Sequence, residues 1–383
     1  MSLGDPLFWP LGRRFEPEEL VFYADRGRRS LGEALAEADL IVCTPHAGAL
    51  VPAELAPFLD PGLTRRLQFD FTDVATSAVT RRWAELDRRV IVVENPHPRM
   101  VRDPNRPEPA DLVATLGEAF ARVAAAGPGQ PVDLSGVDAV RPVMFNFLPL
   151  LTPPAGPAEL ARLADAFRSA AALGVEVYEH TRDQLVERLL ERRLRGSDPG
   201  PRSCFVLSFH DTMNHTARPD GALCVERAPG DRVPSVVALS NRGDADGEPR
   251  GAEPVTMAPA LLRSLADAHR AGFAVTEAAQ VALNQPYLGS QEVTVFGARF
   301  RELADEASRA GATLGAVQAE FSRAYLLGEE ATAHLMRPGV DWPAAPADPA
   351  VPAALADRIA RDLHRSWDLF RAGLPGGRAA SGR

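Results

Sequence analysis

The feature that most constrains the fold is a short run of β-branched apolar residues, 90–93, which is followed at once by a polar loop at residues 94–106. A continuous apolar run of this length is typical of a strand buried within a parallel sheet, and such a sheet needs helices on both faces. Three prolines in the loop prevent the strand from continuing and prevent a helix; they are Pro96, Pro98 and Pro104. The chain of 383 residues is long enough to bury the core of such an α/β fold.

The same loop carries side chains suited to holding a carboxylate: Arg99, Arg102, Asp103, Asn105 and Arg106. Arginine offers a rigid fork of donors to two oxygens, and asparagine adds a neutral donor. Loops at strand ends often carry function, although a polar loop that only caps the edge of a sheet has the same composition. Both interpretations are open from this stretch alone.

Two histidines follow predicted strands. His46 lies just beyond the apolar run 39–43, and His210 lies at the end of the run 204–209. Open α/β sheets bind ligands at the carboxyl ends of their strands, so both positions favour a site, and Gly48 leaves room for a close backbone approach. A single histidine is also explained by a structural, hydrogen-bonded role. His215, in the loop beyond His210, is a further candidate ligand or substrate contact.

Carboxylates occur near the same positions. Asp70 and Asp73 are expected at the start of a helix that runs to about residue 86, where either can complement the helix dipole or bind a metal. The segment 312–320 is predicted to be a strand that delivers Glu320 to the edge of the sheet. Two histidines, an aspartate and a glutamate would then meet at that edge.

The remaining pattern predicts a single α/β domain with a mostly parallel or mixed central sheet flanked by helices. Helices are expected at about 30–37, 110–125, 158–173, 181–195 and 258–271. Strands are expected within 138–154, at 234–241 and at 293–296, the last after a turn built on Pro286 and Gly289. The expected organisation is a lead-in at 1–38, the α/β domain with the site at 39–337, a Pro/Ala linker at 338–352, a helix at 353–371 and a disordered tail at 372–383.

Composition excludes several classes of protein. The chain has no lysine, so it cannot use a Schiff-base lysine, the usual pyridoxal-phosphate chemistry or a P-loop lysine. Its net charge of -9 argues against a general nucleic-acid surface. Three widely spaced cysteines, Cys43, Cys204 and Cys224, argue against a disulfide framework or a cysteine zinc site. Without an apolar leader or a stretch that could span a bilayer, a cytoplasmic location away from membranes is expected.

Two histidines and one carboxylate with an open fourth position make a catalytic zinc site. The candidate ligands are His46, His210 and either Asp70 or Asp73. Glu320 is then the candidate general base for a zinc-activated water. Arg99 or Arg106 is the candidate group that stabilises an oxyanion or grips a substrate carboxylate. Manganese, cobalt or iron could occupy the same ligands.

Six segments, in order along the chain, resemble the N-formylglutamate amidohydrolase family, a deformylase group related to zinc carboxypeptidases. They are PHAGALVP from Pro45, FTD at Phe71–Asp73, PRMVRDPNRP from Pro98, FHDT from Phe209, NQPYLGS from Asn284 and AVQAEFSRAYL from Ala316. The resemblance implies hydrolysis of an N-formyl or N-acyl amino acid to a carboxylate and a free amino acid. It also implies a fold like that of zinc carboxypeptidases and aminoacylases.

By the same resemblance, Asn105 and Arg106 correspond to an Asn-Arg pair that binds the substrate α-carboxylate, and Glu320 corresponds to a catalytic glutamate. Asp103 and Gly289 lie in the segments expected to bind substrate. Two alternatives stay open: a non-catalytic module that binds an acidic metabolite, and a metal-dependent hydrolase that cleaves a C-terminal peptide bond. The sequence does not fix the acyl group, the amino acid or the oligomeric state.

Overall fold

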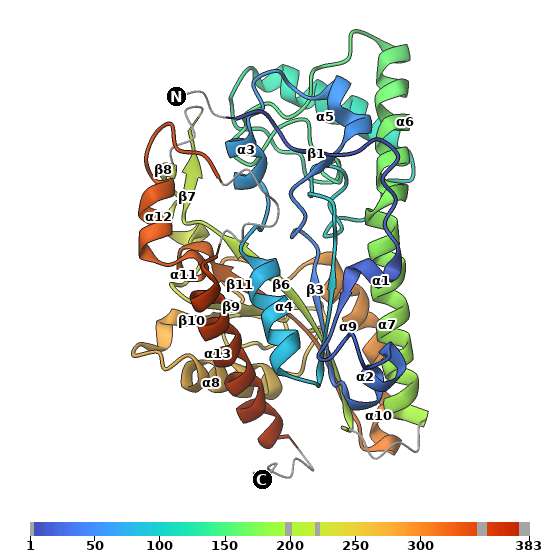
Figure 1. Cartoon of the computed structure of the whole chain (residues 1–383), viewed down its shortest axis with the longest axis vertical. Coiled ribbons are helices and arrows are strands. Elements are labelled where there is room, and N and C mark those ends of the chain that lie inside the picture. The colour runs from blue at the N-terminus through green and yellow to red at the C-terminus, as the bar shows by residue number, and fades with distance from the viewer. Residues whose placement is uncertain (1–3, 196–200, 219–222, 343–350, 375–383) are drawn as a thin grey trace.

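A seven-stranded mixed sheet forms the centre of the protein in the computed structural model (Figure 1). The structure describes residues 4–195, 201–218, 223–342 and 351–374. The strand order is β10-β9-β11-β6-β3-β5-β2. The bounds are β2 Val21–Phe22, β3 Leu40–Thr44, β5 Val90–Glu94, β6 Ser203–Thr212, β9 Val237–Ser240, β10 Val281–Leu283 and β11 Thr313–Ser322. Strands β11, β6, β3 and β5 are parallel, whereas β9 and β2 run antiparallel to β11 and β5. The predicted α/β class with a mixed central sheet is confirmed.

Two layers of helices cover the sheet because side chains alternate between its faces. On β3, Leu40 and Val42 pack with α4 (Thr76–Leu86), α8 (Pro259–Gly272) and α13 (Ala353–Ala372). Ile41 and Cys43 point the other way and pack with α2 (Leu31–Glu37), α7 (Val175–Arg195) and α9 (Gln291–Glu302). Figure 1 shows the sheet between these layers. In the described part of the chain, no helix is both long and apolar enough to cross a membrane.

Shorter elements surround this core. The further helices are α1 Pro17–Leu20, α3 Arg65–Asp70, α5 Leu112–Ala126, α6 Pro157–Leu173, α10 Ala304–Ala310, α11 Arg323–Leu327 and α12 Glu329–Leu335. Single 3-10 turns span Ala53–Phe58, Pro229–Asp231 and Ala278–Gln280. Two small sheets pair β1 (Phe8–Trp9) with β4 (Val51–Pro52), and β7 (His215–Ala217) with β8 (Leu223–Glu226).

Two predicted strands are wrong. The segment 138–154 forms only isolated bridges, because four prolines within it remove ladder donors. The segment 293–296 lies inside α9, where Val293, Phe296 and Phe300 share one buried face at helical spacing. A run of four apolar or β-branched residues cannot by itself distinguish a strand from one turn of a buried helix.

The predicted helix from Asp70 to residue 86 is also wrong at its start. Asp70 is the last residue of α3, which begins after Thr64, whose side chain caps the helix by accepting a hydrogen bond from the Leu67 backbone N–H. Helix α4 begins only at Thr76, so Asp73 lies in the turn between two helices. Helix α7 begins at Val175, earlier than predicted, and β6 continues through His210 because it pairs with β11 over its whole length.

The C-terminal helix α13 is held against the sheet by buried ion pairs. Arg371 is 2.6 Å from both Asp39 and Asp87, and all three side chains are at most 8% exposed. Burial by itself would raise the pKa of Asp87, but the contact with His364 and the charges of Arg371 and Arg89 hold that pKa well below its usual range. Asp87, His364 and Asp368 could together hold a metal, but these arginines already compensate their charge.

The predicted linker at 338–352 is fixed where the structure describes it. Asp341 lies 2.6 Å from Arg65, and the Trp342 indole donates a 2.8 Å hydrogen bond to Asp70. Residues 343–350 of the linker and residues 375–383 of the predicted tail lie outside the described part of the chain.

Loss of the Arg371 ion pairs is expected to destabilise the protein strongly. Arg371→Met leaves two buried carboxylates without their shared partner, so the free energy of unfolding should fall by about 3–5 kcal/mol. Chemical denaturation at neutral pH measures this change. Arg361→Met is the matched control, because Arg361 forms an exposed pair with Asp357 and should cost about 1 kcal/mol or less. A similar, small loss in both variants would contradict the anchoring role of Arg371.

The contact between His364 and Asp87 should make stability depend on pH. The contact of its Nδ1 with Asp87 at 3.2 Å raises the pKa of His364, with burial opposing it. Because the pKa of His364 is raised in the folded state, the contact stabilises the folded protein fully below the pKa of an unfolded histidine, about 6.5. This stabilisation is lost as the pH rises through the pKa of His364 in the folded protein. His364→Gln should therefore lower the free energy of unfolding at about pH 6, by at most about 1 kcal/mol because the side chain is 36% exposed.

Urea unfolding of the wild type and of His364→Gln at about pH 6 and pH 9 checks this dependence. His180→Gln is the control, since His180 is an exposed histidine on α7. An equal loss of stability at both pH values would show that the charge on His364 is not the cause.

Candidate active site

The site begins where one face of two neighbouring strands changes from apolar to polar. On β6, Cys204 and Val206 pack into the core beneath α7 and α9, and the next residues on that face are Ser208 and His210. On β11 the same change runs from Ala316 to Gln318 and Glu320. The parallel register pairs His210 with Glu320. Both side chains therefore project from adjacent positions near the carboxyl ends of the two strands.

A close contact between two loops brings His46 to the same place. The loop after β3 packs against the loop after β5, and Gly48 N–H donates a 3.0 Å hydrogen bond to Asn95 O. A Cβ at position 48 would lie 2.2 Å from the backbone of Pro96, so only glycine allows this approach. The sequence-based expectation for Gly48 is therefore consistent with the structure.

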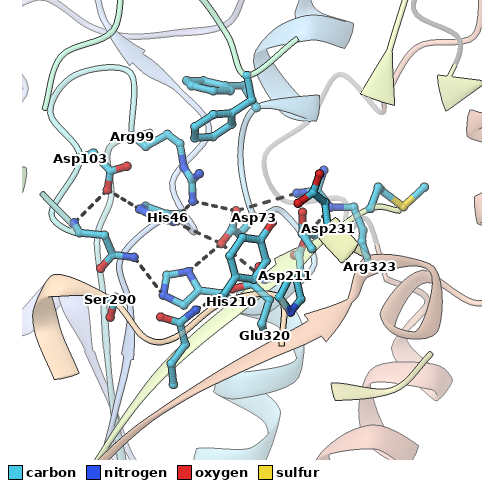
Figure 2. A pocket seen from close by; sticks show the side chains of 18 of the residues that line it. His46, Asp73, Arg99, Asp103, His210, Asp211, Asp231, Ser290, Glu320 and Arg323 are labelled. Atoms are coloured by element: carbon cyan, nitrogen blue, oxygen red, sulfur yellow. Dashed lines mark hydrogen bonds and ion pairs between the residues drawn. The ribbon is translucent and has the colours of Figure 1, made fainter. Parts of the chain in front are cut away.

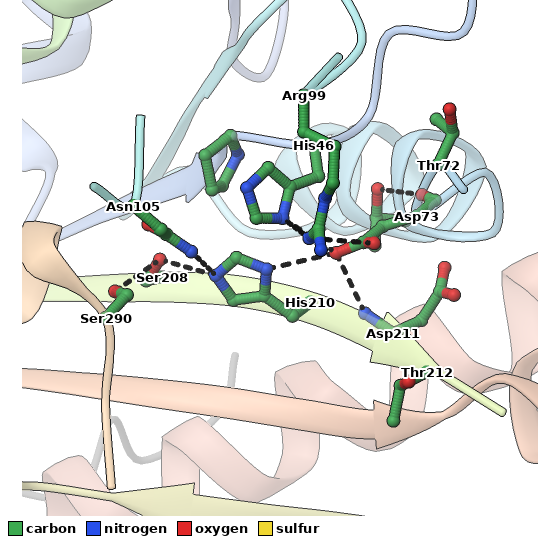
Figure 3. Close-up of polar contacts among 12 residues, drawn as sticks. His46, Thr72, Asp73, Arg99, Asn105, Ser208, His210, Asp211, Thr212 and Ser290 are labelled. Atoms are coloured by element: carbon green, nitrogen blue, oxygen red, sulfur yellow. Dashed lines mark hydrogen bonds and ion pairs between the residues drawn. The ribbon is translucent and has the colours of Figure 1, made fainter. Parts of the chain in front are cut away.

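Three buried side chains form the centre of the pocket: His46, Asp73 and His210. Nδ1 of His210 lies 3.0 Å from Asp73 Oδ2, and Nδ1 of His46 lies 3.4 Å from the same oxygen (Figures 2 and 3). One potential ligand atom from each residue lies within 4.8 Å of the others. Asp73, and not Asp70, is therefore the aspartate beside both histidines, because Asp70 is hydrogen bonded to Arg66 and Trp342.

The outer nitrogen of each histidine has its own partner. Nε2 of His46 lies 2.7 Å from Asp103 Oδ1, and Nε2 of His210 lies 2.9 Å from Ser208 Oγ. Ser208 donates a 2.7 Å hydrogen bond to Glu292. When an outer nitrogen carries its proton toward such a partner, the other nitrogen is free to bind a metal.

The buried carboxylate of Glu292 completes the support of His210. Tyr178 Oη and Arg182 Nη1 donate to its Oε1 at 2.6 and 2.8 Å, while Ser208 occupies Oε2. Arg182 supplies the positive charge that a buried carboxylate requires. Neither Ser208 nor Glu292 was predicted from the sequence. The two-residue spacing of Ser208 and His210 on one strand face was an available signal for the first, but nothing in the local sequence marks Glu292.

The electrostatics of the centre fit a divalent cation. Burial raises the pKa of Asp73 to about 8, although Arg323 opposes this change. Burial lowers the pKa of His210, so its ring is neutral at pH 7, as a metal ligand must be. Arg99 Nη2 contacts His46 Nδ1 and lies 3.4 Å from Asp73 Oδ1, so a positive group is already directed at these atoms (Figure 3). Two imidazole nitrogens and one carboxylate oxygen are a suitable donor set for zinc.

Glu320 lies in the same pocket and is almost fully buried. Gln318 Nε2 donates a 2.9 Å hydrogen bond to its Oε2. Burial raises the pKa of Glu320 to about 7, although its interaction with His210 opposes this change. A carboxylate with such a pKa can both accept and release a proton near neutral pH.

Arg323 and Asp211 fix the turn that carries Asp73. Arg323 pairs with Asp211 and donates a 2.6 Å hydrogen bond to Thr72 O, next to Asp73. Asp211 also accepts a 3.0 Å hydrogen bond from the backbone N–H of Ala75. This pair could not be predicted from the sequence, because the two residues are more than a hundred positions apart and meet only through the pairing of β6 and β11.

The other predicted residues line the same cavity, which has a volume of about 560 Å³. Asn105 Nδ2 lies 3.2 Å from His210 Nε2, and Arg106 donates a 2.5 Å hydrogen bond to Asp138. Asp103, also predicted to bind substrate, lines the cavity and lies 2.7 Å from His46 Nε2. Gly289 lines the cavity with a φ of +122°, which favours glycine. His215 is also in the lining. Their roles toward substrate stay predictions.

Comparison with known proteins places the chain in a family. The family described as N-formylglutamate amidohydrolase matches residues 38–326, which is more than half of the chain. Among solved structures, the crystal structure of N-formylglutamate amidohydrolase from Ralstonia eutropha JMP134 is similar, with 19% identity and a TM-score of 0.44, over 90% of this chain and 97% of that chain. No curated protein is a significant match to the sequence.

Removal of the Ser208 hydroxyl is expected to weaken metal binding. Ser208→Ala deprives His210 Nε2 of its link to Glu292, so zinc affinity should fall about 10-fold or more. Competition with a chromophoric chelator measures the affinity. Ser308→Ala, at an exposed position on α10, is the control. Equal zinc affinity in Ser208→Ala and the wild type would show that this hydrogen bond does not orient the ring.

Proposed function

Since the chain belongs to the N-formylglutamate amidohydrolase family, and is therefore a hydrolase of carbon–nitrogen bonds in linear amides, we propose that it cleaves an N-formyl or N-acyl amino acid with the help of a divalent metal held by His46, Asp73 and His210. The main support for this proposal is that Nδ1 of His46 and Nδ1 of His210 both approach one oxygen of Asp73, while Nε2 of each histidine has another partner. An amidohydrolase of this kind acts on a small-molecule substrate.

The metal would be zinc or another divalent cation, which supplies Lewis acidity and brings the pKa of a water to about 7. Glu320 accepts a proton from the attacking water while the water oxygen bonds to the acyl carbon. Glu320 then donates that proton to the amide nitrogen as the carbon–nitrogen bond breaks. The products are the carboxylate of the acyl group, which is formate for a formyl substrate, and the free amino acid. The raised pKa of Glu320 suits both proton transfers.

Arginines surround this reaction centre with positive charge. Arg99 lies against His46 and Asp73, and its guanidinium can stabilise the oxyanion that develops on the acyl oxygen. Asn105 and Arg106 would bind the α-carboxylate of the amino acid, since both line the cavity and offer a neutral and a charged donor. Asp138 accepts a hydrogen bond only from Nε of Arg106, and Nη1 of Arg106 donates to Asn105 O.

Replacement of Glu320 tests the proposed base. Glu320→Gln keeps the size of the side chain but cannot accept the proton, so kcat for an N-formyl amino acid should fall about 10³-fold. Metal content, measured by elemental mass spectrometry, should stay at about one zinc per chain. Glu302→Gln, at an exposed position on α9, is the control. A rate in Glu320→Gln close to that of the wild type would show that another group is the base.

The double variant His46→Ala/His210→Ala tests the metal site. It should lose both zinc and activity, while the wild type retains about one zinc per chain. A wild type that binds no metal after zinc is supplied at neutral pH would contradict the proposal. Binding of N-formylglutamate by such a metal-free protein would instead favour the non-catalytic module.

A further inference from the structure

One arginine of the pocket has only neutral partners. Arg227, which follows β8, donates from Nη1 to Tyr287 Oη at 2.6 Å and from Nη2 to Thr212 Oγ1 at 3.1 Å. Its Nε is buried and has no hydrogen-bond partner. Within the described residues, no carboxylate lies within 4.0 Å of the Arg227 guanidinium, although the exposed Asp231 lines the same cavity.

The other arginines that line the cavity each contact a carboxylate. Arg99 lies 3.4 Å from Asp73, Arg106 lies 2.5 Å from Asp138, and Arg323 pairs with Asp211. A guanidinium that is partly removed from water without a counter-charge is costly. Its positive charge also attracts anions into the pocket. Among these four arginines, Arg227 is therefore the one whose charge no carboxylate of the described residues compensates within 4.0 Å.

Hydrogen bonds around Arg227 fix its backbone in a position from which the side chain can bind such a ligand. Its backbone N–H donates to Asn214 O at 2.9 Å, and the Asn214 side chain makes two 2.9 Å hydrogen bonds with the backbone of Val233. Tyr287 Oη accepts from Arg227, so its own hydroxyl proton can be donated to an anion. The Thr212 hydroxyl also accepts from Arg227, and it is hydrogen bonded to Tyr287. A carboxylate at this position would meet the charged donor of Arg227 and a hydroxyl donor.

Arg227 and the Asn105–Arg106 pair belong to different sides of the reaction centre. Figure 3 shows Asn105 and Thr212 on opposite sides of His210. Asn105 Nδ2 lies 3.2 Å from His210 Nε2, whereas Arg227 Nη2 donates to Thr212 Oγ1 at 3.1 Å. Both groups line one cavity, and a ligand that engages both needs two carboxylates on different carbons.

We propose that Arg227, supported by Tyr287 and Thr212, binds the side-chain carboxylate of an N-acyl acidic amino acid, while Asn105 and Arg106 bind its α-carboxylate. This inference rests on the proposed function, because it assigns the second carboxylate of the same substrate. It makes Arg227 the residue that selects acidic amino acids over neutral ones of equal size. A neutral side-chain amide would leave the Arg227 charge without a counter-charge, which opposes its binding.

The test compares N-formylglutamate with N-formylglutamine, which has the same length but a neutral side chain. We expect the zinc-loaded wild type to prefer N-formylglutamate in kcat/KM by about 100-fold, as charge-assisted hydrogen bonds allow. Arg227→Met should lose most of this preference, mainly through a higher KM for N-formylglutamate. Arg227→Lys should keep part of it, because lysine retains the charge without the fork. Arg250→Met, which removes an exposed arginine outside the cavity, should leave both rates unchanged.

Two results would overturn the assignment of Arg227: equal use of both substrates by the wild type, or an undiminished preference in Arg227→Met. A wild type that hydrolyses neither substrate contradicts the proposed function rather than the subsite. Calorimetric binding of the two compounds to the wild type and to Arg227→Met then decides the subsite. A binding preference for N-formylglutamate that Arg227→Met loses supports the assignment of Arg227, and equal binding of the two compounds refutes it.

If Arg227→Met does not fold, Tyr287→Phe should show a several-fold loss of kcat/KM specific to N-formylglutamate. The absence of such a loss would count against the proposal.

Discussion

The parallel pairing of β6 with β11 is the constraint on which the site depends. Its register sets His210 directly beside Glu320, and both residues share a face with the apolar core further down the strands. A slip of one residue would turn either side chain toward α8 and α13, into a region packed with aromatic rings. The register is held by burial of Phe209 and Phe321, whose rings stack 4.7 Å apart on the opposite face. The packing of the core therefore determines the distance between a candidate metal ligand and the candidate base.

Around this pair, arginines compensate buried carboxylates. Glu292 is neutralised by Arg182, and Asp211 by Arg323. Buried ions are tolerated only when paired and hydrogen bonded, and arginine is suited to this because its planar fork can serve several acceptors. A chain without lysine meets this requirement with arginine throughout. Against this background, the Arg227 guanidinium, which has only hydroxyl partners, indicates where the pocket would receive an anion.

Much of the fold could be predicted because periodicity reflects burial. The runs that became β3, β5, β6 and β11 are apolar on both faces, as strands between two helical layers must be, and most of the helices followed from their apolar spacing. The errors occurred where local patterns are ambiguous. Residues 293–296 have strand-like composition but complete the buried face of α9, and residues 138–154 have apolar content that their prolines prevent from forming a ladder.

The sequence by itself determined the chemical types available to the site: two histidines after apolar runs, nearby carboxylates, an arginine-rich loop and no lysine. Only the tertiary structure decided between Asp70 and Asp73, since the choice depends on Trp342 and Arg66 binding one and on the two histidines surrounding the other. It also decided that Asp103 is directed at His46 and that Ser208 and Glu292 support His210. These roles depend on contacts between residues that are distant in the chain. Local sequence records which groups are present, but distances and burial arise only when the separate segments pack together.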